Sequence, residues 1–381
     1  MEGSRALQAK NKKLPLGNMD FSIFITVLLL CAFGLVMVFS ASYYYAQQNP
    51  DINDGFYYVR KQGIYLLLSI PAMLVLTRVD YRKLEKFKTI GLLVSIVLLI
   101  AVLIAGKELN GAKRWLVIGG QSLQPSEVAK FGMMLYMCSF MSRKQHLMKD
   151  FVHGMVPMLM VIGIICGLVM LQPNMSMAVI IGMLGIALLY AGGANGKHIA
   201  LLILAGIGLF ALFAVIEPYR LARLTTFTNP WNDGMNGRGD GYQLIQSLYA
   251  LGTGGLFGQG LNNSRQKLLY LTYGESDFVF AIVGEELGYI GAVIVLLAYL
   301  FIVYRGIHVA LKCKDRFGSM LAAGITTVFA LQVIVNIGVV TGFMPTTGQA
   351  LPFISAGGSS LFIFLCAMGV LLNISRHTAS I

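Results

Sequence analysis

The sequence predicts an all-α membrane protein with about ten transmembrane helices and a large outer loop between the seventh and the eighth. The chain has 381 residues, of which 56% are hydrophobic and only 12% are charged. A soluble globular domain carries roughly 25% charged residues, so this chain has too little charge to cover a water-exposed surface. Its apolar residues also fall into runs about long enough to cross a bilayer. We therefore expect one membrane domain and no second soluble domain.

Apolar periodicity and helix breakers place the individual spans. The predicted ranges are 21–42, 61–77, 89–105, 125–141, 154–171, 175–191, 198–216, 277–304, 318–341 and 352–373. Together they form a predicted transmembrane domain, 21–374, between an N-terminal tail, 1–20, and a C-terminal tail, 375–381. The first tail is polar and basic and leads into a full-length span with no small-residue cleavage site, so no cleavable signal peptide is predicted.

The distribution of basic residues predicts the orientation. An even number of spans puts both termini on one side, and the segments on that side carry 18 of the 29 Lys and Arg residues. Because cytoplasmic loops are enriched in Lys and Arg, both termini are predicted to be cytoplasmic. Orientation and anionic lipid headgroups also account for the net charge of +12 without any nucleic acid. The five cysteines have no metal-ligand spacing and are read as small hydrophobic residues.

Residues 217–276 form the predicted outer loop, which is too long for a simple connection. It contains aromatic residues and a mildly apolar stretch from Gln243 to Leu251, followed by five glycines between Gly252 and Gly260. Such apolar and aromatic content argues against disorder. We expect short interfacial helices and a glycine-rich segment that packs over the outer mouth of the bundle.

Ionisable residues in or beside the spans are the first candidates for chemistry, because charge is costly in a membrane. Glu127 and Lys130 lie three residues apart in the fourth span and can pair on one helix face. The pair could position the helix or bind a charged substrate. Asp277 opens the eighth span at the outer boundary and faces either water or a cleft. It could act in chemistry, or it could be a helix-start carboxylate favoured by the helix dipole.

Glu285 and Glu286 lie deeper in the same predicted helix. Glu285 is eight residues beyond Asp277, which is about 12 Å along the helix axis and about 80° around it. The carboxyl pairs of glycosidases stand about 5–9.5 Å apart, so a two-carboxylate hydrolase on this helix alone is not expected. Both glutamates could be structural and hydrogen-bonded to neighbouring spans.

Cationic and hydroxyl side chains gather in the outer loops. The positive-inside rule does not explain basic residues on this side, whereas a phosphate-bearing ligand does; a solvated loop face is the alternative. Gly-Gly-Ser-Ser at a helix start also offers backbone N–H groups to an anion. The candidate substrate-binding residues are Lys113, Arg114, Glu127, Lys130, Arg223, Arg265, Lys267, Ser359 and Ser360.

Taken together and in order, the motifs of the chain resemble the SEDS family of cell-envelope proteins, FtsW, RodA and SpoVE. Each motif is weak alone, but the ordered set covers nearly the whole chain and is specific. The motifs are Asn110–Trp115, Gln124–Glu127 with Lys130, Gln172–Asn174, Asn229–Trp231, Gly241–Gln243 with Gln246 and Ser247, Gly254–Gly258, Asp277–Phe278, Gly284–Gly288, Leu351–Ser355 and Gly357–Ser360. Ser264–Lys267 and Asn336–Gly342 look more like the FtsW/SpoVE branch than RodA.

The chain departs from the family pattern at a few positions. Asn174 and Ser176 stand where the family usually has Asp and Gly, and Ala356 stands where it usually has Tyr. The segment Tyr273–Ser276 replaces the usual residues before the key aspartate, and Asp277 itself is intact. The loss of the carboxylate at 174 puts an acidic role there in doubt, and the changes at 273–276 could alter loop packing or the preferred partner.

The resemblance implies a peptidoglycan glycosyltransferase in the bacterial cytoplasmic membrane, which polymerises lipid II at the outer face during division or spore-cortex synthesis. Asp277 is then the general base that takes the proton from the acceptor sugar's 4-hydroxyl, with inversion at the donor carbon. Cations such as Lys113, Arg114, Arg223 and Arg265 would neutralise the pyrophosphate. No cofactor is required by the sequence, although a divalent cation, Mg²⁺ or Mn²⁺, could share that work.

The resemblance also implies partners. These are lipid II and the undecaprenyl-linked glycan, a class B penicillin-binding protein that cross-links strands, other divisome or sporulation proteins, and membrane lipids. Two other functions stay open from the residues alone. A lipid II flippase would use the intramembrane charges for translocation, and a non-catalytic division scaffold would not depend on Asp277.

Overall fold

The computed structural model describes residues 17–109, 112–119, 121–216, 226–233, 235, 237–239 and 241–378. It is a bundle of long helices, and each predicted span overlaps one of them. The long helices are α2 (Phe21–Gln48), α3 (Tyr57–Leu76), α4 (Lys88–Ala105), α5 (Pro125–Arg143), α6 (Val156–Met170), α7 (Met175–Ala191), α8 (Gly196–Ile216), α11 (Val279–Lys312), α12 (Arg316–Val340) and α13 (Gly358–Thr378).

Short elements lie between these helices. They are the 3₁₀ turns η1 (Tyr81–Phe87) and η2 (Gln145–Leu147), the π-helical turn η3 (Phe151–Met155), the helix α10 (Tyr242–Gly254), and the strands β1 (Lys107–Leu109), β2 (Ala112–Ile118) and β3 (Gln121–Leu123). The strands form one antiparallel sheet in the order β1-β2-β3. The all-α prediction is therefore confirmed for the bundle, with this small sheet as an addition that the sequence did not indicate.

Length and composition support a multi-pass membrane protein. Among the described residues, seven helices are long and apolar enough to cross a bilayer, and α7 with part of α8 are shorter apolar helices. Helix α5 falls outside both groups because it carries Glu127, Lys130 and Arg143. The total of ten spans stays a prediction.

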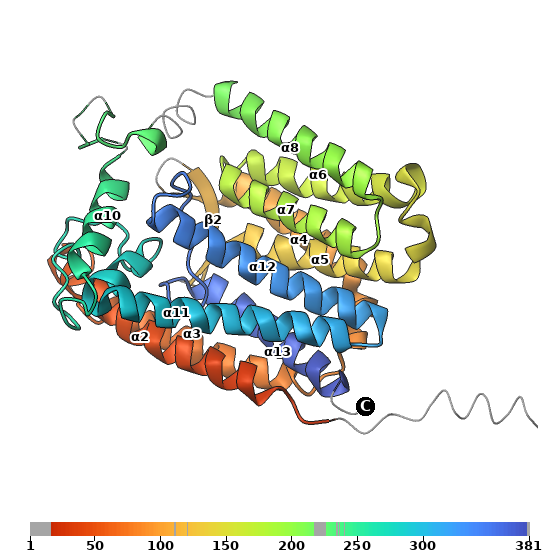
Figure 1. Ribbon diagram of the computed structural model, residues 1–381, viewed down its shortest axis with the longest axis horizontal. Helices are drawn as coiled ribbons and strands as arrows, with labels where there is room; N and C mark the ends of the chain where they lie inside the picture. The colour runs from red at the N-terminus through yellow and green to blue at the C-terminus, as the bar shows by residue number, and fades with distance from the viewer. Residues whose placement is uncertain are drawn as a thin grey trace, which may run out of the picture.

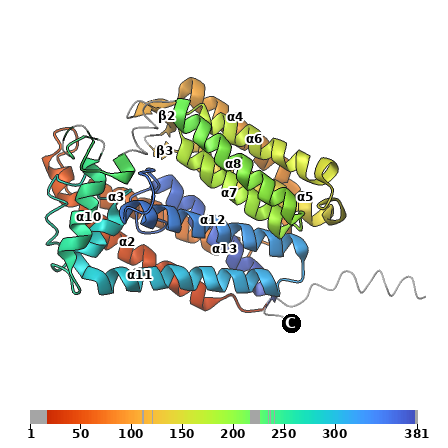
Figure 2. The ribbon, with the colours of Figure 1, turned by 45° about the horizontal axis from the view of Figure 1, so that its top comes forward.

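Two groups of helices make up the bundle. Figure 2 shows α4 to α8 in one group and α2, α3, α11, α12 and α13 in the other. Helix α12 packs against α5 and α7 of the first group and against α11 and α13 of the second. Side chains on α12 therefore lie where the two groups meet, and buried Gln332 and Asn336 are among them.

Local sequence signals define several helix starts. The side chains of Asp20, Asn174 and Asp315 accept hydrogen bonds from backbone N–H groups in the first turns of α2, α7 and α12. Proline at the first position favours the start of α5 at Pro125. The last predicted span begins too early, because Pro352 to Gly357 form a loop and α13 begins at Gly358.

The two described ends of the chain meet at one end of the bundle. The Gly17 N–H donates to the Arg376 carbonyl at 3.0 Å, and the Asp20 carboxylate accepts from Arg305 of α11 at 2.9 Å. Figure 1 shows α10 and the sheet at the opposite end. Both ends therefore lie on one face, as an even number of spans requires; the assignment of that face to the cytoplasm stays a prediction.

The outer segment before α11 has the expected helix and glycine-rich stretch. Helix α10 covers the predicted apolar stretch and packs on α11. Helix α11 is interrupted at Gly288, whose φ is 69°. There the Gln259 and Gly260 N–H groups donate to the Glu285 and Glu286 carbonyls at 2.9 and 3.0 Å. The glycine-rich segment thus satisfies backbone groups that the break in α11 leaves unpaired.

Candidate active site

A cavity of about 580 Å³ lies at the end of the bundle that carries the sheet. Its walls come from β2, β3 and the starts of α3, α5, α10 and α13, together with the loops 273–278 and 346–357. Among the predicted residues, it is lined by Asp277, Arg114, Glu127, Ser359 and Ser360. The structure therefore brings together five residues that are up to 246 positions apart in the sequence.

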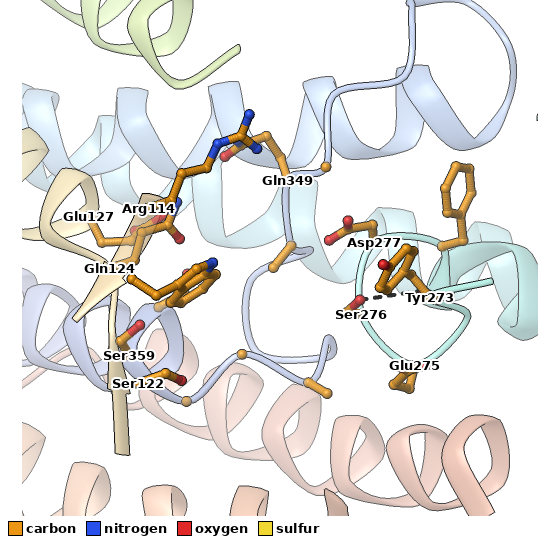
Figure 3. A pocket seen from close by; sticks show the side chains of 18 of the residues that line it. Arg114, Ser122, Gln124, Glu127, Tyr273, Glu275, Ser276, Asp277, Gln349 and Ser359 are labelled. Carbon is orange, nitrogen blue, oxygen red and sulfur yellow. Dashed lines mark hydrogen bonds between the residues drawn. The ribbon is translucent and has the colours of Figure 1, made fainter. Parts of the chain in front are cut away.

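Asp277 does not sit inside α11. The helix begins at Val279 after the N-cap residue Phe278, and its first turn holds no acidic residue. This outcome argues against the helix-start interpretation of Asp277, because the carboxylate precedes the helix. In Figure 3 the carboxylate points toward the chain segment that carries Gln349. Gly348 of that segment, with a φ of 66°, is so close that an added Cβ would lie 3.4 Å from Asp277 Oδ2.

The electrostatics of Asp277 suit a base. Burial raises the pKa of its carboxyl to about 6. Among the described residues, no hydrogen bond or ion pair to this carboxylate is found, so nothing there lowers the pKa again. A carboxylate with a raised pKa accepts a proton more readily near neutral pH than an ordinary aspartate does.

Glu275 is a second carboxylate in the cavity wall that the sequence reasoning did not single out. It is 8% exposed, and burial, with the neighbouring Asp277, raises the pKa of its carboxyl to about 7. Figure 3 shows Glu275 and Asp277 pointing in different directions. The sequence signal was the unusual segment Tyr273–Ser276 before Asp277, which was interpreted as a change in loop packing or in the preferred partner.

The loop 351–357 is tied to the segment that carries these carboxylates. The Ser355 hydroxyl donates to the Ser276 carbonyl at 2.5 Å and accepts from the Leu351 N–H at 2.7 Å. The Ala356 N–H donates to the Glu275 carbonyl at 2.9 Å. The predicted Gly-Gly-Ser-Ser helix start follows directly, with Ser359 and Ser360 in the first turn of α13 and in the cavity wall.

Arg114 and Glu127 face the cavity from the other helix group. Arg114 on β2 donates through Nε to the Gln172 carbonyl at 3.3 Å and through Nη2 to the Pro173 carbonyl, which joins the sheet to the turn before α7. Asn174 also lines the cavity, and its side chain caps α7. The role that the structure gives to position 174 is thus one that Asn performs as well as Asp.

Glu127 and Lys130 form the predicted ion pair, with 3.0 Å between Lys130 Nζ and Glu127 Oε2. Both are nearly fully buried, and only Glu127 lines the cavity. Lys130 lies behind it, where its ammonium also donates to Gln332 Oε1 at 2.7 Å and lies over the Phe364 ring. For Lys130 the positional interpretation therefore fits, and direct contact with a substrate in the cavity does not.

Lys267 and Arg265, two of the predicted substrate-binding residues, do not line the cavity. The Lys267 ammonium is buried and bound to Glu286 Oε1 at 3.0 Å and Ser40 Oγ at 3.1 Å. The Arg265 side chain is exposed away from the cavity, while its N–H donates to Glu285 Oε1 at 2.9 Å. Both glutamates anchor the outer segment to α11. Glu286 also accepts from Ser40 of the neighbouring span α2, as predicted, whereas the partners of Glu285 lie in the outer segment and not in a span.

Two further residues predicted to bind substrate are Lys113 and Arg223. Lys113 on β2 is exposed and does not line the cavity, whereas the two residues that follow it, Arg114 and Trp115, do. Arg223 lies outside the described residues. Within the described ranges, no three His, Cys, Asp or Glu side chains gather as a metal site.

Comparisons with known proteins agree with this arrangement. The family model for the cell cycle proteins FtsW, RodA and SpoVE matches residues 20–380. Stage V sporulation protein E of Bacillus subtilis is 40% identical over 361 residues, which cover 94% of this chain and 97% of that protein. The probable peptidoglycan glycosyltransferase FtsW of Geobacter metallireducens is 40% identical over 360 residues, covering 94% and 95%.

Solved structures show the same fold. A chain from a study described as "Structural coordination of polymerization and crosslinking by a peptidoglycan synthase complex" superposes with a TM-score of 0.77 at 26% identity, covering 94% of this chain and 98% of that one. The rod shape determining protein RodA of Thermus thermophilus superposes with a TM-score of 0.67 at 26% identity, covering 94% and 97%.

Proposed function

We propose a function from one premise: the chain belongs to the family of FtsW, RodA and SpoVE. It is a peptidoglycan glycosyltransferase that polymerises lipid II into glycan strands, in cell division or spore-cortex synthesis. The observation that carries this proposal is the Asp277 carboxylate, which has a raised pKa and faces a cavity lined with polar and cationic groups.

The reaction needs one base and stabilisation of one leaving group. Asp277 takes the proton of the acceptor sugar's 4-hydroxyl while that oxygen attacks the anomeric carbon of the donor sugar. The bond from that carbon to the polyprenyl pyrophosphate breaks, and the pyrophosphate leaves with the bonding electron pair. The new link has inverted configuration. The leaving group is already acidic, so no second carboxylate is required as general acid.

The opposite wall of the cavity supplies groups that suit the leaving pyrophosphate. Arg114 offers a planar guanidinium, and the first turn of α13 offers the hydroxyls of Ser359 and Ser360 beside its N-terminal N–H groups. In a site with little water, such preorganised donors stabilise developing negative charge strongly. The donor sugar would then lie between these groups and Asp277.

Orientation and partners complete the proposal. Both termini would be cytoplasmic, so that the cavity opens at the outer face, where lipid II headgroups are presented. A class B penicillin-binding protein would cross-link the product strands. The structural neighbour described as a synthase complex for polymerization and crosslinking supports such a partner.

The test is polymerisation of labelled lipid II by the purified full-length chain, alone and with a candidate class B partner. We expect Asp277→Asn to reduce glycan polymer by at least about 10²-fold while lipid II binding and thermal stability are kept. Glycan polymer at the wild-type level from Asp277→Asn would overturn the assignment of the base. Lipid II translocation in proteoliposomes without any polymer would favour a flippase instead.

A further inference from the structure

Two buried amide side chains on α12 lie behind the cavity. Gln332 and Asn336 are four residues apart, so they project from the same face of the helix on successive turns. Each is only 1% exposed. Burying an amide in the middle of a membrane bundle is costly unless its hydrogen-bonding groups are used, so their partners are informative.

Asn336 holds two loops together at the cavity. Its Nδ2 group donates to the Asp277 carbonyl at 2.8 Å and to the Gln349 carbonyl at 2.6 Å. Its Oδ1 atom is buried without a hydrogen-bond partner among the described residues. Asn336 therefore contributes through its two N–H donors, which satisfy carbonyls that belong to no helix or strand.

Gln332 makes the equivalent link to the other helix group. Its Nε2 donates to the Ala350 carbonyl at 3.1 Å, next to the Gln349 carbonyl that Asn336 holds. Its Oε1 accepts from the Lys130 ammonium at 2.7 Å, and Lys130 pairs with Glu127 in the cavity wall. Hydrogen bonds thus run from Glu127 through α12 and the loop 349–350 to the backbone of Asp277.

The Asp277 carboxylate itself is not held by hydrogen bonds from the described residues. A donor on its oxygens would fix its direction, but it would also favour the charged form and weaken the base. Holding the peptide carbonyl of the same residue fixes where the side chain starts and leaves the carboxylate oxygens free for a substrate hydroxyl.

We propose that Asn336 is a positioning residue for Asp277, and that Gln332 couples it to the Glu127–Lys130 pair on the opposite wall. This inference rests on the proposed function, in which Asp277 is the base. It assigns to α12 a role in the reaction although neither amide lines the cavity.

The experiment compares Asn336→Leu, which has a similar volume but no donor, with Asn336→Asp, which has the same shape and cannot make both donations. Asn336→Gln keeps the NH₂ group and serves as the conservative rescue. The matched control is Asn373→Leu, because Asn373 on α13 is also 1% exposed and donates to a loop carbonyl, that of Thr77, at 2.8 Å. It lies near the chain ends, far from the cavity.

Polymerisation of labelled lipid II by the full-length proteins is measured per folded molecule, together with KM and the pH profile. For Asn336→Leu and Asn336→Asp we expect kcat to fall about 10- to 100-fold with KM within about threefold, since a displacement of about 1 Å has effects of this size. For Asn336→Leu we expect the acid limb of the pH profile to move to lower pH, because a carboxylate that is no longer held in place reaches water and loses part of the burial that raises its pKa. For Asn336→Asp we expect it to move to higher pH, because a second carboxylate beside Asp277 disfavours its charged form. The variants leave in place the other titratable and charged side chains that face the cavity, which are Tyr58, Lys61, Arg114, Glu127, Tyr273 and Glu275.

The outcomes distinguish a role of Asn336 in positioning Asp277 from a role in protein stability alone. Reduced kcat in both variants, partial recovery in Asn336→Gln and wild-type kcat in Asn373→Leu support the inference. Wild-type kcat and pH profile per folded molecule in Asn336→Asp would overturn it, even if Asn336→Leu does not fold. An equal loss in Asn373→Leu would also overturn it. Asp277→Asn is run beside them: glycan polymer at the wild-type level from that variant would overturn the assignment of Asp277 as the base, on which this inference rests.

Discussion

The glycine-rich segment packs so closely against α11 that the effect of a single methyl group at Gly258 can be predicted. Gly258 has a φ of 82°, and a Cβ added there would overlap the Glu286 carbonyl oxygen. Gly258→Ala therefore combines backbone strain with a clash against backbone atoms, which cannot move aside as a flexible side chain does. We expect the segment to separate from α11 at the Gly288 break.

The size of the destabilisation follows from the added backbone strain and the hydrogen bonds that are lost. A non-glycine residue in such a conformation costs about 1–3 kcal/mol. The two hydrogen bonds from Gln259 and Gly260 to α11 contribute about 1 kcal/mol each. Gly258→Ala should therefore lower the free energy of unfolding by about 3–5 kcal/mol. It should also reduce polymerisation, because the same segment leads into the loop of Asp277.

Substitutions at two neighbouring glycines separate the effect of backbone strain from the effect of the steric clash. Gly255 has a φ of 56° with nothing within 4 Å of an added Cβ, so Gly255→Ala tests strain alone. Gly252 in α10 has neither problem, and Gly252→Ala should stabilise by up to about 1 kcal/mol through helix propensity. Unfolding is followed in detergent against SDS. A free energy of unfolding for Gly258→Ala equal to that of Gly252→Ala would refute the reasoning.

Two further predictions concern the charged groups of the cavity. Lys130→Met leaves Glu127 buried without its partner and should lower the free energy of unfolding by about 3–5 kcal/mol. The double variant, Lys130→Met combined with Glu127→Gln, should recover part of this loss, and unfolding in detergent measures both. The raised pKa values of about 6 for Asp277 and about 7 for Glu275 mean that ionisation opposes folding. As the pH rises from about 4 to about 7, the free energy of unfolding should fall. Asp277→Asn and Glu275→Gln should each be more stable than wild type at pH 8 but not at pH 4. Equal melting temperatures of variant and wild type at pH 8 would contradict this.

The bundle could be predicted from sequence because its signals are local. Long apolar runs, caps and breakers determine where helices begin and end, and each predicted span overlaps a helix in the structure. The sheet at 107–123 was missed because its strands are short, and two contain only three residues each. The early start predicted for the last span at Pro352 reflects an apolar run that continues through a loop.

The site was predictable only in part because a cavity depends on contacts between distant segments. The position of Asp277 at the outer boundary, directly after the long loop, identified it. The polar motifs identified Arg114, Glu127 and the two serines. Charge type alone could not separate Lys267 from these, since its burial against Glu286 depends on how the outer segment folds back. Asn336 was seen only as part of a branch motif, and nothing local shows that its amide reaches the Asp277 carbonyl.

These contacts explain how a segment without regular secondary structure can hold the proposed base, Asp277, in a defined place. The segment between α10 and α11 is mostly turns, yet hydrogen bonds anchor it at several points. Glu285 and Glu286 hold its middle to α11 through Ser264, Arg265 N–H and Lys267. Asn336 of α12 holds its end at the Asp277 carbonyl. Because α11 and α12 also pack against each other, movement between these two helices would move Asp277 relative to the opposite wall of the cavity.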